Sequence, residues 1–405
     1  MKILVLSSLA YSLTNFRGDL LQAMLGAGHQ VTACAPDRDS VTEQRLKSWG
    51  ASFAHTPMSR TGTSPFADLK LLADYVRLMR QEKPDIVLAY TQKPIIYGGL
   101  AARIAGGRPF YALMSGLGHV FSPQSTFPAP LRRVISVLYR EALRRAHATF
   151  VFNADDRADM IRFGIVTEKQ NVMQVPGSGV SLDRYANTTP PTEKLNFLLI
   201  GRLMKNKGIM EFLEASRMVR AQGGDCSFTI VGRCENENPE GLDEASCEKL
   251  FGEDDVEFVP GTDDVRPYLR KCSVFVLPSF YREGLPRTIL EALSSGRAVI
   301  TTDLPGCRDP IEEGENGFLV APMDAADLAG AMMRFVNQPE LVISMGNAAR
   351  AIAETRYDVR LVNRILLTEM GLIDRVQKRS ASSIVPDAPP TMSVVGKNKE
   401  VGPSL

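Results

Sequence analysis

The chain has 405 residues, which is too long for one ordinary domain and sufficient for two domains with large cores. Hydrophobic residues make up 44% of it and charged residues 23%, as in ordinary globular proteins, and no run approaches the ~20 apolar residues of a membrane-spanning helix. The net charge of +1 hides an asymmetry, because residues 1–190 hold 22 Lys and Arg against 14 Asp and Glu, and the rest holds 25 against 32. We expect the basic half to face an anionic partner; the alternative is an uneven surface without a function.

In the first half of the chain, the predicted strands and helices alternate. Short apolar runs predict strands at residues 2–7, 31–35, 85–89, 110–114 and 148–152. Apolar positions at helical spacing predict helices at residues 16–27, 68–79, 97–105 and 131–146. This alternation is typical of a doubly wound parallel sheet.

The same alternation restarts after residues 187–192, a polar stretch with two prolines that suits a linker. The predicted strands are 196–201, 227–232, 257–259, 274–278, 298–301 and 317–320. The predicted helices are 209–222, 265–271, 286–293, 324–337, 339–354 and 358–377.

These patterns predict an α/β protein with two Rossmann-like doubly wound domains that face each other across a cleft. We expect domains at residues 1–190 and 191–355, and a helix at 356–377 that packs back toward the first domain. Residues 378–405 are rich in Ser and Pro and are expected to be a disordered tail. Because open α/β sheets bind ligands beyond the carboxyl ends of their strands, the cleft is the expected site.

The six cysteines form no C-x-x-C pair, and residues 1–8 form a predicted strand rather than a secretion signal. We therefore expect reduced thiols and a cytoplasmic protein.

The most informative stretch is Tyr281–Glu291, which joins a predicted strand to a predicted helix. Pro286 suits the first helical position, Glu283 lies in the loop and Glu291 lies in the helix. A helix that begins here directs N–H groups and a partial positive charge at the cleft, where a diphosphate would bind. Because phosphates repel carboxylates, the two glutamates are expected to face the hydroxyls of a sugar and a ribose.

A second loop, residues 200–209, lies where the first strand of the second half turns into a helix. Gly201 allows close approach of the backbone to a ligand, and Arg202 and Lys207 supply two cations that suit a diphosphate. A solvated basic turn is the alternative. The position of the loop at the same sheet edge as Glu283 and Glu291 favours the ligand site.

With these two loops, the chain resembles retaining glycosyltransferases of family 4, which have the GT-B architecture and carry Gly-Arg-Leu-x-x-x-Lys-Gly followed by two glutamates eight residues apart. The resemblance extends from Met1 to about Val376. More narrowly, residues 15–17, 114–118 and 304–308 are similar to bacterial enzymes that add hexosyl or N-acetylhexosaminyl units to a polyprenyl-diphosphate-linked sugar.

The resemblance implies that Arg202 and Lys207 hold the diphosphate of a UDP-sugar and stabilise it as the leaving group. The sugar nucleotide is then a substrate, and no cofactor or metal is implied. The chemistry agrees, since two cations and a helix N-terminus can neutralise a departing diphosphate.

The resemblance also implies that Glu291 binds the ribose hydroxyls and that Glu283 contacts the donor sugar. The backbone N–H groups of Gly284 and Leu285 would lie near the sugar or the diphosphate. His119 would contact the donor sugar or lie near the acceptor hydroxyl; an ordinary loop histidine is the alternative.

Asp37 and Asp39 match the Asp-x-Asp signature of metal-dependent glycosyltransferases of another architecture. Their place after the second predicted strand favours a polar strand-to-helix turn instead.

A basic helix at residues 131–146 carries five arginines and an apolar stripe that includes Val134 and Leu143. The stripe is expected to lie in the core, with a helix lying in a membrane interface as the alternative, and the arginines are expected to meet anionic lipid.

The predicted function is therefore a retaining transfer of a hexose or N-acetylhexosamine to a lipid-linked or other glycan, by a peripheral protein at the inner leaflet of the plasma membrane, with no nucleic-acid partner. No residue stands out as the nucleophile of a double displacement, and family enzymes are usually explained by same-face attack. The alternatives are a nucleotide-sugar hydrolase or epimerase, and a non-catalytic nucleotide-sugar-binding partner.

Overall fold

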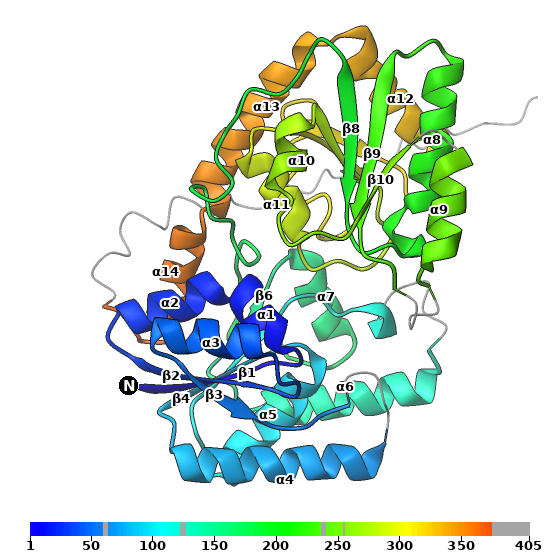
Figure 1. Ribbon diagram of the computed structural model, residues 1–405. Coiled ribbons are helices and arrows are strands. Elements are labelled where there is room, and N and C mark those ends of the chain that lie inside the picture. The colour runs from blue at the N-terminus through cyan, green and yellow to red at the C-terminus, as the bar shows by residue number, and fades with distance from the viewer. Residues whose placement is uncertain (60–63, 122–126, 236–239, 254–255, 375–405) are drawn as a thin grey trace, which may run out of the picture.

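The computed structural model describes residues 1–59, 64–121, 127–235, 240–253 and 256–374, which form two parallel sheets, one in the lower and one in the upper half of Figure 1. The prediction of two doubly wound α/β sheets is confirmed. The expected disordered tail at 378–405 lies outside the described residues.

The first sheet has the strand order β3-β2-β1-β4-β5-β6-β7, and its pairings are parallel. Its strands are β1 (Lys2–Leu6), β2 (Gln30–Ala35), β3 (Ser52–His55), β4 (Ile86–Tyr90), β5 (Phe110–Met114), β6 (Ala148–Val151) and β7 (Val172–Gln174). The central strands β4 and β5 are buried throughout, as continuous apolar runs in a sheet covered on both faces should be.

Helices cover both faces of this sheet (Figure 1). On one face lie α1 (Ala10–Asn15), α2 (Gly18–Gly26) and α3 (Ser40–Trp49); on the other lie α4 (Pro65–Glu82), α5 (Gln92–Ile104) and α6 (Ala129–Leu143). The loop after β5 contains the 3-10 turn η1 (His119–Phe121), and α7 (Ala154–Arg162) follows β6.

The apolar stripe of α6 was expected in the core. This prediction is right for Leu143 but wrong for Val134, whose exposed fraction is 53%.

The second sheet has the order β10-β9-β8-β11-β12-β13 and is also parallel. Its strands are β8 (Leu195–Ile200), β9 (Cys226–Gly232), β10 (Glu257–Pro260), β11 (Val274–Leu277), β12 (Ala298–Thr302) and β13 (Gly317–Val320). Successive residues point to opposite faces, so Leu198 and Leu199 belong to different core clusters.

The helices of this half are η2 (Lys205–Lys207), α8 (Ile209–Ala221), α9 (Glu244–Glu253), α10 (Arg266–Lys271), α11 (Arg287–Ser294), α12 (Ala325–Asn337) and α13 (Glu340–Ile352), followed by a π-helical turn, η3 (Ala353–Tyr357). One core cluster joins β8 to α8 and α12, and the cluster on the other face contains residues of α10, α11 and α13.

The last helix, α14 (Val359–Glu369), crosses back to the first domain and packs on α2 (Figure 1). Nε2 of His29 lies 2.8 Å from the carbonyl oxygen of Leu372, and Asn171 donates a hydrogen bond of 2.9 Å to Glu369. The core cluster that contains β1 therefore continues through α14 into the second half.

Several sequence predictions differ from the structure. The helix expected at 16–27 begins only at Gly18, because Phe16 and Arg17 form the junction with α1 and Arg17 has a non-helical backbone. The helix expected at 358–377 ends at Glu369, and Gly371 follows with a φ of +67°. Six elements were missed (α1, α3, α7, α9, β3 and β7). In α3 only Thr42 and Leu46 are buried, so the segment has no apolar periodicity to detect.

Candidate active site

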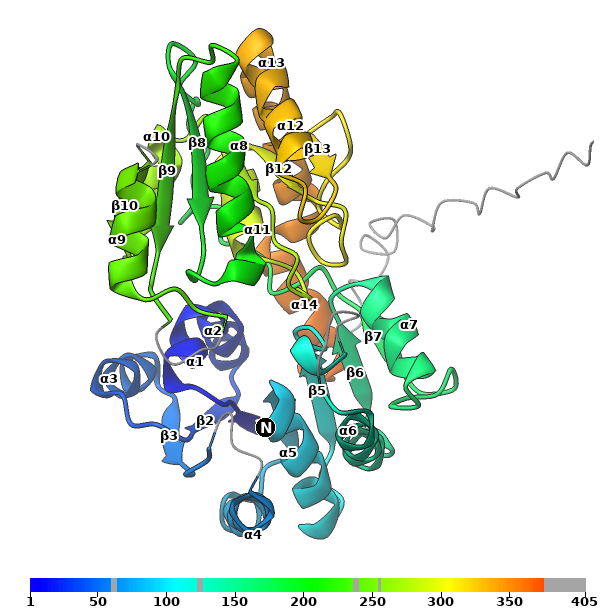
Figure 2. The same cartoon turned by 90° about the vertical axis from the view of Figure 1, so that its right-hand side faces the viewer.

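Apart from His119 in η1 and Glu291 in α11, the residues predicted to bind the ligand lie in the connections at the carboxyl ends of β8 and β11. In Figure 2 the arrows of β8 and β9 point down toward the first domain. These loops therefore lie on the side of the second sheet that faces the first domain, which is the edge where parallel sheets bind ligands.

The turn from β8 into α8 is shaped by glycine. Gly208 has a φ of +77°, and a Cβ there would lie 2.2 Å from the carbonyl oxygen of Pro278, so no other residue fits. The close approach of the Gly208 backbone to Pro278 places the preceding turn, η2, against the end of β11. At Gly201 a Cβ would meet no atom within 4 Å, so the backbone there borders open space.

Lys207 and Glu283 form an ion pair that is almost buried. Nζ of Lys207 donates to Oε1 of Glu283, and the exposed fractions of the two side chains are 11% and 13%. The hydroxyl of Ser279 donates to the same oxygen over 3.1 Å, and Nζ lies 5.2 Å from the ring centroid of Tyr281. A cation and a carboxylate thus lie side by side, so one ligand can meet both.

Glu291 is held on the first turns of α11. Nε of Arg287 donates to Oε1 of Glu291 over 3.0 Å, and Nη1 of the same arginine donates over 2.6 Å to the carbonyl oxygen of Asn15 in the first domain. Burial and the neighbouring Glu291 carboxylate raise the pKa of Tyr185. Glu291 is therefore oriented by two side chains, one of which joins the two domains.

Arg202 is held less firmly than the Lys207–Glu283 pair. The side chain of Arg202 is 51% exposed, and Oε1 of Glu235 lies 4.0 Å from its Nη1. The backbone of His119 lies in η1, next to Gly118, where a Cβ would be 3.6 Å from the hydroxyl of Tyr281. The side chain of His119 lies outside the described part of the structure.

The loop that carries Glu283 contacts the first domain directly. A Cβ on Gly284 would lie 2.2 Å from the carbonyl oxygen of Ser115, and Nδ2 of Asn153 donates over 2.7 Å to the carbonyl oxygen of Gly284. Leu285 is buried, and a Cβ on Gly177 would lie 2.4 Å from its Cδ2. Gly284 is thus required for the close approach of the two domains.

Ion pairs surround this contact. Arg282 donates over 3.0 Å to the fully buried Asp156 of α7, and its Nη1 lies 2.6 Å from Oδ2 of Asp159. Arg308 donates over 2.7 Å to Asp155. Burial raises the pKa of Asp156 to about 6, although Arg282 opposes this shift.

Asp37 and Asp39 serve local structure. Asp37 accepts a hydrogen bond of 2.8 Å from the backbone N–H of Ala10, and Asp39 caps α3 by accepting from Val41 and Thr42. This agrees with the predicted polar turn.

Two family models match the chain in succession. Residues 14–176 match a glycosyl transferase 4-like domain, and residues 194–338 match the glycosyl transferases of group 1. The chain belongs to this glycosyltransferase family. It is a glycosyltransferase, and the resemblance read from its two loops is confirmed.

Several curated glycosyltransferases are similar to this one. The N,N'-diacetylbacillosaminyl-diphospho-undecaprenol alpha-1,3-N-acetylgalactosaminyltransferase of Campylobacter jejuni is 27% identical and matches over 93% of this chain and 100% of its own. The UDP-Gal:alpha-D-GlcNAc-diphosphoundecaprenol alpha-1,3-galactosyltransferase of Escherichia coli is 26% identical over 74% of this chain and 78% of its own.

Solved structures share the fold. Anabaena Alr3699/HepE in complex with UDP and glucose superposes with a TM-score of 0.73 at 20% identity, covering 92% of this chain and 100% of that one. The sucrose-phosphate synthase of Thermosynechococcus elongatus superposes with a TM-score of 0.74 at 18% identity, covering 90% and 97%. The predicted GT-B architecture of this glycosyltransferase is confirmed.

Sequence reasoning missed residues that hold the site of this glycosyltransferase together. Arg287 was detectable, because an arginine four residues before Glu291 on one helix predicts an ion pair. Tyr185 and Asn153 gave no such signal, since their contacts join residues more than 100 positions apart.

Proposed function

We propose that this glycosyltransferase moves a hexose or an N-acetylhexosamine from a UDP-sugar to a lipid-linked glycan, with retention of anomeric configuration and without a metal ion. The acceptor would be a sugar on a polyprenyl diphosphate. Two relatives support the acceptor class, since both are named for a diphospho-undecaprenol substrate. One of them is named for UDP-Gal, and HepE was solved with UDP, which supports the donor class.

The Lys207–Glu283 ion pair carries this proposal. Lys207 and the exposed Arg202 would neutralise the diphosphate as its bond to the sugar breaks. Glu283 would hold a sugar hydroxyl beside that diphosphate, which its direct contact with Lys207 supports. The N–H groups of Gly284 and Leu285 would complete the diphosphate site.

Glu291 would accept hydrogen bonds from the ribose hydroxyls of the nucleotide. Its carboxylate is 9% exposed and already oriented by Arg287, so its ordering costs little when the ribose binds. His119, in the turn beside Tyr281, would lie near the sugar or the acceptor.

We propose further that the face of the first domain formed by α4, α5 and α6 meets an anionic bilayer at the inner leaflet of the plasma membrane. This face exposes large apolar side chains, with exposed fractions of 85% for Phe66, 62% for Leu69, 53% for Ile104 and 44% for Val137. Arg133 and Arg140 of α6 are exposed beside Val137. Exposed apolar groups among arginines suit a membrane interface.

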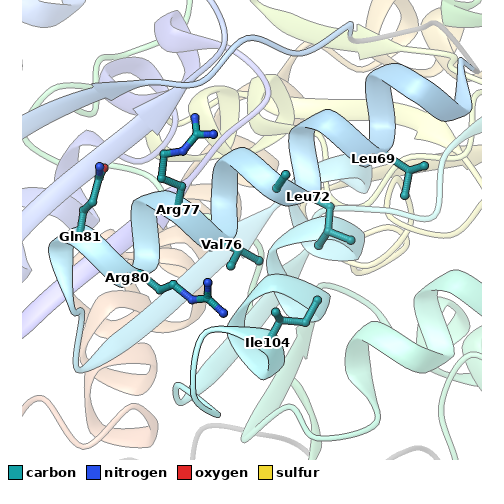
Figure 3. Close-up of a pocket in the computed structure, with 8 residues that line it drawn as sticks. Leu69, Leu72, Val76, Arg77, Arg80, Gln81 and Ile104 are labelled. Atoms are coloured by element: carbon teal, nitrogen blue, oxygen red, sulfur yellow. The ribbon is translucent and has the colours of Figure 1, made fainter.

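A surface pocket between α4 and α5 belongs to this face (Figure 3). Apolar side chains and two arginines line it (Leu69, Leu72, Val76, Ile104, Arg77 and Arg80). It lies away from the loops after β8 and β11, so it supports lipid contact rather than donor binding. In the described residues, no helix is long and apolar enough to cross a membrane.

The proposal is tested by thermal-shift screening with UDP-, GDP- and ADP-sugars, followed by transfer assays on polyprenyl-diphosphate-linked and soluble sugars. A ligand that binds only the folded protein raises its midpoint of unfolding, and we expect this from one UDP-hexose or UDP-N-acetylhexosamine. Transfer should require the lipid-linked acceptor and persist in EDTA. A soluble glycan as the preferred acceptor, or loss of activity in EDTA with rescue by Mn²⁺, would contradict the proposal.

A further inference from the structure

Arg17 is a buried arginine at the junction of α1 and α2 that the proposed donor site does not use. Its exposed fraction is 6%, and its guanidinium carbon lies 5.2 Å from the ring centroid of Tyr90 and 5.7 Å from that of Phe152. Tyr90 ends β4 and Phe152 directly follows β6. The guanidinium therefore lies at the carboxyl edge of the first sheet, where this domain would receive a ligand.

The guanidinium has no anionic partner among the described residues. Nε of Arg17 is buried without a hydrogen-bond partner, and the titratable groups that influence it are Tyr90 and a second cation, Arg287. Burial lowers the pKa of Arg17 to about 10, so it stays protonated at neutral pH. A buried cation is ordinarily paired, because its transfer from water is otherwise unfavourable.

A second positive feature begins beside Tyr90. α5 starts at Gln92 without a side-chain cap, so the N–H groups of Gln92 and Lys93 and the helix dipole favour an anion, whereas Pro94 has no N–H group. Thr91, between Tyr90 and α5, has a φ of +70°, which is rare for a β-branched residue, and its buried Oγ1 has no hydrogen-bond partner. Arg17, through its contact with the Tyr90 ring, and the start of α5 thus both lie at the carboxyl end of β4.

We propose that Arg17 and the first turn of α5 form a second phosphate site, which holds the diphosphate of the acceptor. This rests on the proposed function, in which the acceptor carries a diphosphate. The donor diphosphate already has two cations, Arg202 and Lys207, on the other domain. Arg17 lies two residues after Asn15, which receives a hydrogen bond from Arg287 of α11, so the second site would lie across the domain contact from the donor site.

The first test is calorimetric titration of inorganic pyrophosphate into protein saturated with UDP, which occupies the donor site. The native protein should bind pyrophosphate, and Arg17→Gln should weaken that binding by about tenfold or more, as loss of a charged hydrogen bond does. Arg17→Lys, which keeps the charge, should be intermediate. Arg103→Gln, which removes a half-buried arginine paired with Glu141 in the same domain, should bind pyrophosphate normally.

The second test compares two acceptors in steady-state kinetics, the sugar on a polyprenyl diphosphate and the same sugar as a simple alkyl glycoside. Arg17→Gln should raise KM for the diphosphate acceptor by about tenfold or more and leave KM for the alkyl glycoside unchanged. Thermal midpoints without ligand identify any variant that has lost its fold.

The first two of the following results would overturn the inference, and the third would instead overturn the proposed function. Weaker UDP binding in Arg17→Gln, with no pyrophosphate bound beside UDP, would assign Arg17 to the donor. An equal rise in KM for both acceptors, or unchanged binding and kinetics, would leave Arg17 as a packing residue on Tyr90 and Phe152. Binding of pyrophosphate that depends on Arg17 without sugar transfer to any lipid-linked acceptor would keep the site and remove the proposed reaction.

Discussion

At the scale of single residues, burial makes the charges of Lys207 and Glu283 depend on each other. With exposed fractions of 11% and 13%, each would be left as an unpaired, nearly buried charge if the other were removed. Arg202, at 51%, is instead available to move toward a ligand at little cost. Of the two cations expected to act on one diphosphate, Lys207 is therefore nearly buried and paired, whereas Arg202 is exposed.

Arg202→Ala and Lys207→Ala should each lower kcat by ~10²-fold or more, because each removes a charge that stabilises the leaving diphosphate. The matched control is Lys205→Ala, which removes an exposed lysine from the same turn and should leave kcat unchanged. Steady-state rates at saturating substrates measure the effect. Unchanged turnover in both Arg202→Ala and Lys207→Ala would remove the phosphate assignment.

Substitutions of Glu283 and Glu291 should separate nucleotide binding from sugar transfer. Glu291→Ala should chiefly weaken UDP binding, and Glu283→Ala should bind UDP but transfer sugar poorly. Calorimetry with UDP and turnover assays distinguish them. Glu354→Ala, which removes a carboxylate paired with Arg350 at the same i,i+4 spacing, is the control for loss of a helix ion pair. UDP binding as tight in Glu291→Ala as in the native protein would show the ribose role to be wrong.

At this scale the sequence predicted the residues that form local motifs. Arg202 and Lys207 share one short segment, and Glu283 and Glu291 share a loop and the helix that follows it, so spacing along the chain predicted each pair. The hydrogen bond from Arg287 to Asn15 and that from Asn153 to Gly284 depend on how the two domains meet, which spacing does not determine. Tyr281 lay inside the motif, yet its ring beside Lys207 became evident only with the geometry.

At the scale of elements, the contact between α7 and the loop after β11 holds the two domains together. Arg282 reaches from that loop to two aspartates of α7, and Asn153, the cap of the same helix, donates to the loop. The site residue Glu283 directly follows Arg282, so the contact and the site share one loop.

Asp156 should make this contact pH-dependent. Its folded pKa of about 6 lies above the ~3.9 of an unfolded aspartate, so its contribution to stability is complete below about pH 4 and is lost as pH rises through about 6. Asp156→Asn removes this titrating carboxyl group. The difference in unfolding midpoint between native protein and variant should therefore change from pH 4 to 7, whereas a constant difference would contradict the shifted pKa. Asp74→Asn, which removes a helix aspartate that pairs with Arg77 away from this contact, is the control.

Element prediction succeeded where burial imposes a pattern. The central strands of both sheets are mostly apolar and were found, whereas α3 and α7 bury two residues each and were not. The edge strands β3 and β7 are short and only half-buried, which leaves no apolar run to detect. The split between α1 and α2 was missed because Phe16 looks like a core position yet is 46% exposed.

At the scale of the whole molecule, exposed apolar side chains of α4, α5 and α6 and exposed arginines of α6 lie on one face of the first domain. Arg133→Glu with Arg140→Glu should weaken binding to anionic liposomes, since each basic residue near such a surface contributes about 1 kcal/mol. Arg132 is left intact because its guanidinium lies 5.6 Å from the ring centroid of Phe163 and also serves packing.

Added salt should weaken this liposome binding, because the Debye length shrinks from about 10 Å at 0.1 M to about 3 Å at 1 M. UDP binding should survive the same changes, since the donor site lies on the second domain. Arg270→Glu with Lys271→Glu, on exposed positions of α10, is the control. Salt-insensitive binding, or none to anionic vesicles, would favour a soluble acceptor.

The central claim, acceptor-dependent sugar transfer at the Lys207–Glu283 site, is tested most directly by measuring UDP release and product formation in one reaction. The account predicts one UDP for each glycosidic bond formed, retained anomeric configuration in the product, and no UDP release when the lipid-linked acceptor is omitted. Both signals should fall together in Lys207→Ala. UDP release without acceptor, or a product of inverted configuration, would contradict it.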